Sequence, residues 1–323
     1  MKKITLILMA AMLMMTAGSC KKDKTDVNGN GNGTTTTNDG VFNPSQKISK
    51  YYYWNEYDEE KILEQVWNWD GKQLSSIDYT DWEGTVYNTE YFTYEHNRLS
   101  KVVDLYERYE FKYADGKLKK VTNYYNDELR AEYTISYGSN NKISMMEGVY
   151  YEGKKAAKER FNPLSLILPE QMMGRLDRNS VQKEDKWSSK ESYTETFTIT
   201  LTWDGDNVSK AEYNGEFVEG DGYGNYTEMN SYQYDNKHNP KYGFMNRYFP
   251  DIEGFGSNNI IKCIYSGREE YYENGALVEE EDESGEYRIT YQYDESNYPT
   301  MYEVSRYYDG SYSYSYKYFY EYK

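Results

Sequence analysis

Tyrosine sets the strongest constraint on what this chain can fold into. Of the 323 residues, 41 are tyrosine, and in the last segment they occupy every second position: Tyr312, Tyr314, Tyr316, Tyr318, Tyr320 and Tyr322. Alternate side chains of a β-strand point to the same face of a sheet, so this spacing predicts a strand with one tyrosine face. Each ring can bury roughly 150–250 Å² while its hydroxyl group stays hydrated or hydrogen-bonded. A polar, acidic chain can therefore still build a core.

The same period of two recurs through the body of the chain. Phe197, Ile199, Leu201 and Trp203 alternate with threonines, and the tyrosines of residues 287–293 alternate with Arg, Thr and Gln. Aromatic and β-branched residues suit a pleated, half-buried surface. The pattern predicts antiparallel strands that bury one face.

A recurrent turn signature separates the predicted strands. An aromatic residue ends one strand, a short Asp/Gly/Asn turn follows, and an aliphatic residue begins the next strand. The aromatic residues of these copies are Trp69, Tyr94, Tyr113, Tyr137, Trp203, Tyr234 and Tyr293. Asp-Gly and Asn-rich turns supply the positive φ that tight hairpins need. We predict an all-β fold: an antiparallel meander of many hairpins, curled into a soluble barrel-like or rolled sheet, with a short helical insertion.

Two segments interrupt the hairpin pattern, near residues 161–186 and 239–259, and each begins with Asn-Pro. The first holds the longest apolar run of the mature chain, and Pro169 is suited to open a short helix that ends near Leu176. We expect both insertions to pack on an end or face of the sheet. Each could be a lid over the core, or a plug or lid for a ligand.

The N-terminus resembles a bacterial lipoprotein signal. Lys2 and Lys3 precede an apolar stretch at residues 4–15, and small residues then lead to Cys20. Residues 1–19 are predicted to be the signal peptide, with lipid (palmitate) attached at Cys20. Residues 20–46 form a predicted flexible tether, and 47–323 a single β domain. The alternatives are an uncleaved anchor or an ordinary signal with a chance cysteine. The predicted location is the outer membrane, with the protein facing the periplasm or the cell surface.

The charge balance excludes some partners. The net charge is −17 and there is no basic stripe, which argues against binding of nucleic acid and against attraction to anionic lipid headgroups. A lipidated Cys20 would leave Cys263 as the only free thiol, so we expect no intrachain disulfide. Within a strand-like stretch, Cys263 is expected to be a small buried hydrophobe.

Catalytic signatures are weak. His96 and His238 both lie in predicted turns, which disfavours a Ser/His/Asp hydrolase or a histidine-rich zinc site. The acidic run at residues 279–283 is expected to be a solvated hairpin tip. The sequence predicts no catalytic residues, no metal and no cofactor.

Tryptophan offers the best candidate ligand contacts. Trp67 and Trp69 are two residues apart on one strand, and Trp203 ends another. Indole rings on a sheet face can form a platform for sugar rings, with polar neighbours that add hydrogen bonds. The alternative is that these three rings fill the core of the sheet or stabilise it through cross-strand pairs.

The turn signature, with Trp69-Asp70-Gly71 before Leu74 as an example, resembles the YD (Rhs-type) repeats of secreted bacterial proteins. From Cys20 to the C-terminal tyrosine strand, the pattern is similar to a family of tyrosine-rich lipoproteins of Gram-negative gut bacteria. That family has no known function and is described as having a porin-like β fold. The resemblance implies a curled, barrel-like antiparallel sheet, and it assigns no catalytic residue.

A lipid-anchored envelope protein is the function that the sequence favours, most simply a non-enzymatic binding module for a polysaccharide or an envelope protein. A lipid-spanning barrel needs an apolar outer band, whereas the residues opposite the expected core face are mostly polar. The alternatives are an envelope structural or assembly protein and, less favoured, a glycoside hydrolase. Exposed aromatic residues would support a binding module, and an uninterrupted polar surface would support a structural role. Carboxylates that converge in a cleft would support a hydrolase.

Overall fold

The structure, a computed structural model, describes residues 42–55, 59–152, 166–167, 193–219, 222–246, 252–308 and 310–323. All of them belong to the unit Thr34–Lys323. They form sixteen strands and one short helix. The predicted signal peptide, Cys20 and the predicted helix at residues 169–176 lie outside the described residues.

The first nine strands are β1 (Ile48–Asn55), β2 (Glu60–Asp70), β3 (Gln73–Thr80), β4 (Val86–Glu95), β5 (Arg98–Val103), β6 (Glu107–Ala114), β7 (Lys117–Tyr125), β8 (Glu128–Tyr137) and β9 (Ile143–Glu152). The remaining elements are β10 (Tyr193–Asp204), β11 (Asn207–Glu219), β12 (Gly222–Tyr234), α3 (Ile252–Phe255), β13 (Ile260–Glu273), β14 (Ala276–Tyr293), β15 (Pro299–Tyr308) and β16 (Ser311–Tyr322).

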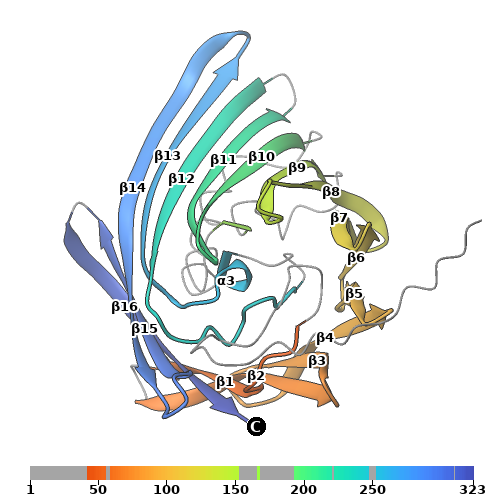
Figure 1. Ribbon diagram of the computed structural model, residues 1–323. Helices are drawn as coiled ribbons and strands as arrows, with labels where there is room; N and C mark the ends of the chain where they lie inside the picture. Colours follow the sequence, from red (N-terminus) through yellow and green to blue (C-terminus); the bar gives the residue numbers. More distant parts are fainter. Residues whose placement is uncertain are drawn as a thin grey trace, which may run out of the picture. The chain divides into compact units, whose positions relative to one another are not determined.

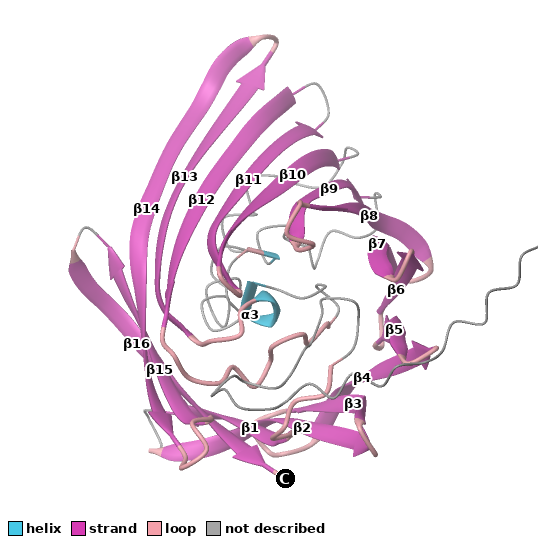
Figure 2. Ribbon diagram, in the orientation of Figure 1, coloured by secondary structure: helices cyan, strands magenta, loops and turns pink. Residues whose placement is uncertain are grey.

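The strands form a closed barrel. Each strand pairs with its neighbours in the chain, and β1 pairs antiparallel with β16, so the order around the barrel is the order of the sequence (Figure 1). The closing seam is built from tyrosines, with Tyr51 opposite Tyr320 and Tyr53 opposite Tyr318. Figure 2 shows strands throughout the wall. The predicted all-β antiparallel meander is confirmed.

The tyrosine face of β16 is only partly buried. Tyr318 and Tyr320 are in the core, whereas Tyr312 is exposed. Tyr312 lies next to the turn between β15 and β16, beyond a register shift in their pairing. The core therefore covers only the later tyrosines of the period-two pattern.

The predicted turn signature forms one end of the barrel, which we call the repeat rim: the turns that follow β2, β4, β6, β8, β10, β12 and β14. The turns that follow the odd-numbered strands form the far rim. Asp115 and Gly116 connect β6 to β7 with φ of 51° and 78°, as a tight two-residue hairpin turn requires. In all seven copies the strand pairing shifts register at the aromatic residue itself. The signature thus specifies a bulge as well as a turn.

Hydrogen bonds clasp the base of most repeats. The aromatic residue near the end of an even-numbered strand donates to the backbone carbonyl oxygen of the first or second residue of the preceding strand. The pairs are Trp69 to Ile48, Tyr94 to Leu74, Tyr137 to Leu118, Trp203 to Ile143, Tyr291 to Ile260 and Tyr322 to Pro299, at 2.7–3.0 Å. We call this bond the base clasp. It joins the two strands of each of these six pairs at the repeat rim.

The connection between β12 and β13 packs inside the barrel at the repeat rim (Figure 1). The Phe244 ring lies 4.8 Å from Trp67 and 6.0 Å from Phe92 between centroids. The Phe255 ring of α3 meets Trp203 edge-on at 6.0 Å. The described part of the 239–259 insertion therefore covers the core from within one end. Phe42, inside the predicted tether, also packs on Phe244 and is buried, since its apolar ring has a partner there.

Side chains alternate between the two faces of the barrel wall. On β10, Phe197, Ile199 and Leu201 are in the core while threonines alternate with them on the outer face.

Among the described residues, no helix has the length and apolar character needed to cross a membrane.

Candidate functional site

Trp67 is a core residue. It is 3% exposed, its Nε1 donates a 2.9 Å hydrogen bond to Gln65 Oε1, and its ring packs on Phe244. A ligand could not stack on this ring without opening the barrel. Of the two sequence alternatives for Trp67, the structure shows core filling.

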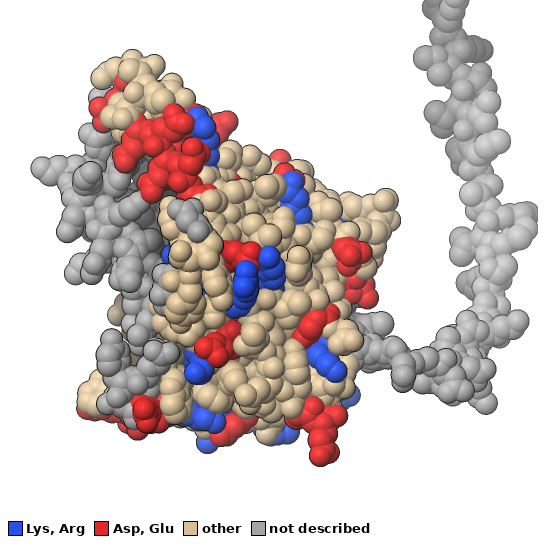
Figure 3. Space-filling model, turned by 90° about the vertical axis from the view of Figure 1, so that its left-hand side faces the viewer, with Lys and Arg blue, Asp and Glu red and all other residues tan. Residues whose placement is uncertain are grey.

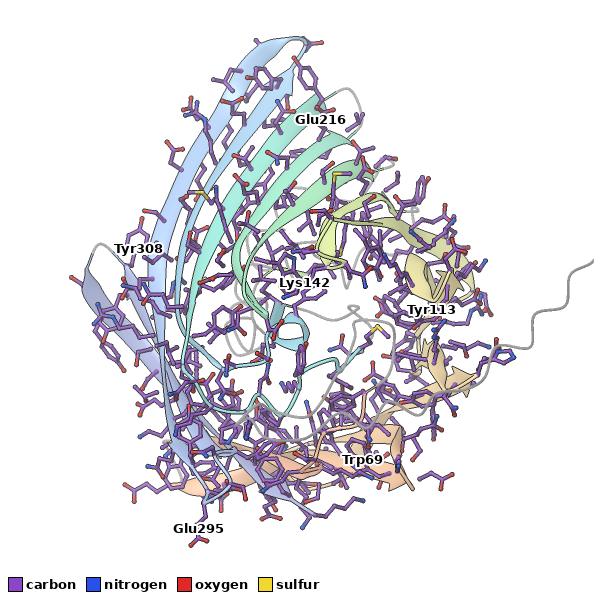
Figure 4. The ribbon with its side chains drawn as sticks, in the orientation of Figure 1. Trp69, Tyr113, Lys142, Glu216, Glu295 and Tyr308 are labelled. Atoms are coloured by element: carbon purple, nitrogen blue, oxygen red, sulfur yellow. The ribbon has the colours of Figure 1, made fainter. Side chains whose placement is uncertain are left out.

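Trp69 and Trp203 occupy equivalent, half-buried places at the repeat rim. Each indole makes a base clasp, and a lysine covers each ring: Lys47 Nζ lies 4.9 Å from the Trp69 centroid and Lys142 Nζ 4.9 Å from that of Trp203. Trp69 and Lys142 are labelled in Figure 4. A lysine contacts the rings of Trp69 and Trp203, and both rings also pack against the core, which contains Trp67. The three predicted tryptophans therefore do not form an open platform for a ligand.

A different set of residues forms an exposed apolar surface on the far rim of β3–β8. We call it the far-rim patch, and its members are Trp82, Val86, Tyr87, Tyr91, Leu105, Tyr106 and Leu129. Trp82 is 76% exposed, Leu105 65% and Tyr87 63%. Sequence reasoning missed this patch. The available signal was a tryptophan in the turn Asp81-Trp82-Glu83-Gly84, where no strand can bury it.

The turn between β3 and β4 holds Trp82 at its tip. One carboxylate oxygen of Asp81 accepts hydrogen bonds from the backbone N–H groups of Glu83 (2.9 Å) and Thr85 (2.8 Å). The Asp81 N–H donates to the Thr85 carbonyl oxygen at 2.9 Å, and Gly84 has a φ of 80°. These bonds order the turn, so the indole is presented at little entropic cost.

The neighbouring turn between β5 and β6 is ordered in the same way. Asp104 Oδ1 accepts from the N–H groups of Tyr106 (2.9 Å) and Glu107 (2.7 Å). Asn88 of β4 bridges to this turn, donating to Asp104 Oδ2 (3.3 Å) and accepting from the Leu105 N–H (3.4 Å). The side chains of β4 and of this turn therefore belong to one surface.

The third turn, between β7 and β8, extends the far-rim patch. The Tyr106 and Tyr125 rings stack with centroids 6.1 Å apart, and the Asn126 N–H donates to the Tyr106 carbonyl oxygen at 2.9 Å. Leu129 follows at the start of β8, opposite Tyr124. Three adjacent turns are thus linked into a single pre-organised surface.

A buried polar cluster supports the patch from beneath. Arg130, which is 3% exposed, donates to the Tyr150 hydroxyl (3.1 Å) and to Glu107 Oε1 (3.3 Å). Burial alone would lower the pKa of Arg130, but Tyr150 and Glu107 together raise it. The charged guanidinium ties β6, β8 and β9 together just inside the patch.

The other predicted features lie apart from the patch. His96 is an exposed residue of the β4–β5 turn, and the His238 ring packs 5.0 Å from that of Tyr298. Cys263 is fully buried, as expected, and burial raises the pKa of its thiol. In the part of the chain that is described, no three His, Cys, Asp or Glu residues gather as a metal site.

The acidic run Glu279–Glu283 lies on β14 next to its turn with β13, and all five side chains are exposed. Figure 3 shows acidic side chains gathered at the top of the face turned to the viewer. The run is solvated, as predicted, but it is not the hairpin tip: Glu279 is paired with Tyr271 inside the strand, and the tip is the turn at Asn274 and Gly275.

Comparison with known proteins adds little to this geometry. No protein-family model matches the chain, and no curated protein matches it. One solved structure that it resembles is a porin-like protein from Bacteroides uniformis, with 10% identity over 85% of this chain and 98% of that chain, at a TM-score of 0.29. A likeness at that score carries no argument, so the fold rests on the strand pairing itself.

Fold and surface together define a class: the described residues form a closed sixteen-strand antiparallel barrel with a buried core, and the far-rim patch is exposed on it. The closed barrel fits the porin-like β fold that the sequence resemblance implied. The lipoprotein signal and the relation to YD repeats stay predictions.

Proposed function

We propose that this protein is a lipid-anchored envelope protein that binds a partner through the far-rim patch and does no chemistry. The exposure of the seven apolar patch residues, on adjacent strands and turns that hydrogen bonds and a stacked ring pair link together, is the observation that carries the proposal. Large exposed apolar surfaces bordered by polar residues mark interaction sites in soluble domains. A purely structural role would leave an uninterrupted polar surface, which the patch interrupts.

An envelope protein is the partner that the patch fits best. Aliphatic side chains (Val86, Leu105 and Leu129) lie among the aromatic ones, and acidic residues such as Glu83 and Asp127 are at the edges. An apolar centre with enriched aromatic residues and a polar border is the usual anatomy of a protein–protein interface.

A polysaccharide is the second candidate partner of the patch. Trp82 and Tyr87 expose large ring surfaces, and apolar ring faces flanked by polar groups suit sugar rings. The two candidate partners differ in how much the aliphatic residues contribute to binding, because the Leu105 side chain should add little to the affinity for a sugar.

Pull-down from envelope extracts tests the proposal. We expect one protein to be captured by the wild-type chain and lost with Trp82→Ala combined with Leu105→Ser. Tyr308→Ala with Tyr312→Ser is the matched control, because these residues are also exposed on the far rim but on β15 and β16 (Tyr308 is labelled in Figure 4). Equal capture by all three forms would contradict the proposal. Retardation in gels that contain a polysaccharide, lost with Trp82→Ala but kept with Leu105→Ser, would favour the second candidate.

The proposed membrane anchor has its own test. Replacing Cys20 with Ala should move the protein from the membrane fraction to the soluble fraction, because lipidation needs the thiol. Cys263→Ala is the control and should leave fractionation unchanged. Retention of the Cys20→Ala form in membranes would contradict lipid anchoring.

A further inference from the structure

The outer face of β7–β14 carries two adjoining hollows that are separate from the far-rim patch. The larger, of about 620 Å³, lies over β7–β11, and the smaller, of about 320 Å³, lies over β11–β14. Asn214 of β11 lines both of them. The two hollows are therefore parts of one surface.

Strand register arranges the floor of this surface as a straight row. Outward residues that pair directly across successive strands run through both hollows: Thr134, Glu147, Thr198, Asn214, Thr227 and Arg268. Neighbouring strands lie about 4.8 Å apart, so the row from β8 to β13 spans about 24 Å. We call it the cross-strand row.

A row of inward residues lies beside the cross-strand row. Aromatic residues and glycines alternate there across five strands: Tyr133, Gly148, Phe197, Gly215 and Tyr226. A Cβ atom on Gly148 would lie 2.3 Å from Phe197 Cζ and 2.8 Å from Tyr133 Cδ1. The rings thus occupy the space that a side chain on Gly148 would need. Gly148 and Phe197 also line the larger hollow, so this packing lies directly beneath it.

The lining carries hydroxyl, amide and carboxylate groups and lacks an available cation. Lys120 is paired with Glu132. Arg268 is paired with Glu270 at 2.9 Å and with Glu280 at 2.7 Å. Glu147, Asn214 and Glu216 are exposed to solvent, and Figure 4 labels Glu216. Ionised carboxylates accept strong hydrogen bonds from hydroxyl groups, whereas an anionic ligand would meet carboxylates without a free positive charge.

We propose that the cross-strand row binds an uncharged polysaccharide strand, laid across β8–β13 at right angles to the β-strands. Glu147 and Asn214 bond its hydroxyl groups from the floor, and Glu216 does so from the side. The length of the row matches several sugar rings, and the absence of an exposed aromatic ring among the lining residues makes recognition polar. This site goes beyond the far-rim patch, so one chain could hold a glycan strand and a protein partner at once.

Calorimetric titration of the full-length protein in mild detergent tests the site. The probes are neutral cello-, malto-, xylo- and manno-oligosaccharides of two to eight units, with oligogalacturonate as the acidic comparison. For at least one neutral series, affinity should rise with length and level off at about five units, when the chain has covered the row. Oligogalacturonate should bind at least about tenfold more weakly. Absence of binding to every neutral series, or stronger binding of oligogalacturonate, would overturn the proposal.

Variants locate the binding. Thr198→Tyr, which fills the larger hollow, and Asn214→Ala, which removes only an exposed amide, should each weaken binding, the first by about tenfold or more. Thr93→Tyr is the matched control because Thr93 is exposed on the outer face of β4, outside the hollows. Trp82→Ala should leave oligosaccharide binding intact. Loss of binding with Trp82→Ala but not with Thr198→Tyr would place the glycan on the far-rim patch and overturn the cross-strand site. Capture of the protein partner is unaffected by Thr198→Tyr, which keeps the two proposals distinguishable.

Discussion

The Nε1 of Trp69 donates a 2.8 Å hydrogen bond to the carbonyl oxygen of Ile48, and Trp203 does the same to Ile143 at 2.7 Å. In both cases the lysine just before the acceptor residue covers the indole ring. Lys117 covers Tyr137 in the same manner, and Tyr137 bonds the Leu118 carbonyl oxygen. In three of the six base clasps the hydrogen bond is thus combined with a cation–π contact. Both Trp and Tyr can donate the hydrogen bond and accept the cation on their ring, so either can serve as the signature aromatic.

Removing one clasp donor should cost stability without changing the fold. Trp203→Phe keeps an aromatic ring but leaves the Ile143 carbonyl oxygen without its donor, so unfolding free energy should fall by about 1–2 kcal/mol. Urea unfolding measures this, with an unchanged m-value as the sign that the same surface is buried. Trp82→Phe, at an exposed site, should change stability by less than about 0.5 kcal/mol. Equal losses in the two variants would refute the clasp.

Adding a methyl group at Gly148 should destabilise the barrel wall. The new Cβ would overlap the Phe197 ring, and overpacking of this kind costs about 1–3 kcal/mol. Gly148→Ala combined with Phe197→Leu should lose less than the sum of the two single changes, because the smaller side chain makes room. A double-mutant cycle from urea unfolding gives the coupling energy, and additive losses would show that the ring and the glycine are not in contact.

The buried ion pair of the β12–β13 connection should be sensitive to the loss of one partner. Lys241 Nζ lies 3.2 Å from Glu253 Oε2, and the two side chains are 5% and 8% exposed. Lys241→Met leaves a buried carboxylate without its counter-ion and should cost about 3–5 kcal/mol. Adding Glu253→Leu should restore much of that loss. The exposed pair of Lys50 with Glu321 provides the control, since Lys50→Met should change stability by about 0–1 kcal/mol.

Glu228 should make stability depend on pH. Burial raises the pKa of this carboxyl group, against the smaller opposing effect of hydrogen bonds from Tyr226 and Asn230. A raised pKa means that the folded state binds a proton more tightly than the unfolded chain. The stabilisation is thus complete below the unfolded pKa, near about 4.5, and is lost as the pH rises towards the folded value. Glu228→Gln cannot ionise, so it should gain in stability relative to wild type between about pH 4 and about pH 7. Chemical denaturation at both pH values measures the difference, and a constant difference would contradict the assignment.

The hairpins could be predicted because turn chemistry is local. Asp115-Gly116 adopts positive φ whatever lies across the barrel, and the aromatic and aliphatic residues that flank it then pair by register. Six of the seven copies became short turns at one rim for that reason, whereas the copy at Tyr234 leads into the longer connection between β12 and β13. The solvent exposure of the acidic run on β14 and the burial of Cys263 also followed from local sequence, although the run lies within the strand and not at the hairpin tip.

Barrel closure and the identity of the exposed aromatics could not be predicted. The pairing of Tyr51 with Tyr320 depends on strand number and stagger, which no local pattern contains. Trp67 and Trp82 are the same residue type, and the difference between them is that Phe244 reaches Trp67 from a distant connection. Gly222 and Gly224 lie in β12 against the rings of Tyr271 and Phe217. Their role is visible only once the neighbouring strands are in place.

The closure of β1 on β16 has an evolutionary consequence. Six of the eight successive strand pairs carry a clasp between their own two strands, so gene duplication or deletion of one whole pair would leave the clasps of the other pairs intact. The first and last strands meet in antiparallel orientation only when strands are gained or lost in twos. Recombination at the repeat borders would thus change the number of strands in the barrel by two at a time. The first and last strands of the domain would still be the pair that closes the barrel.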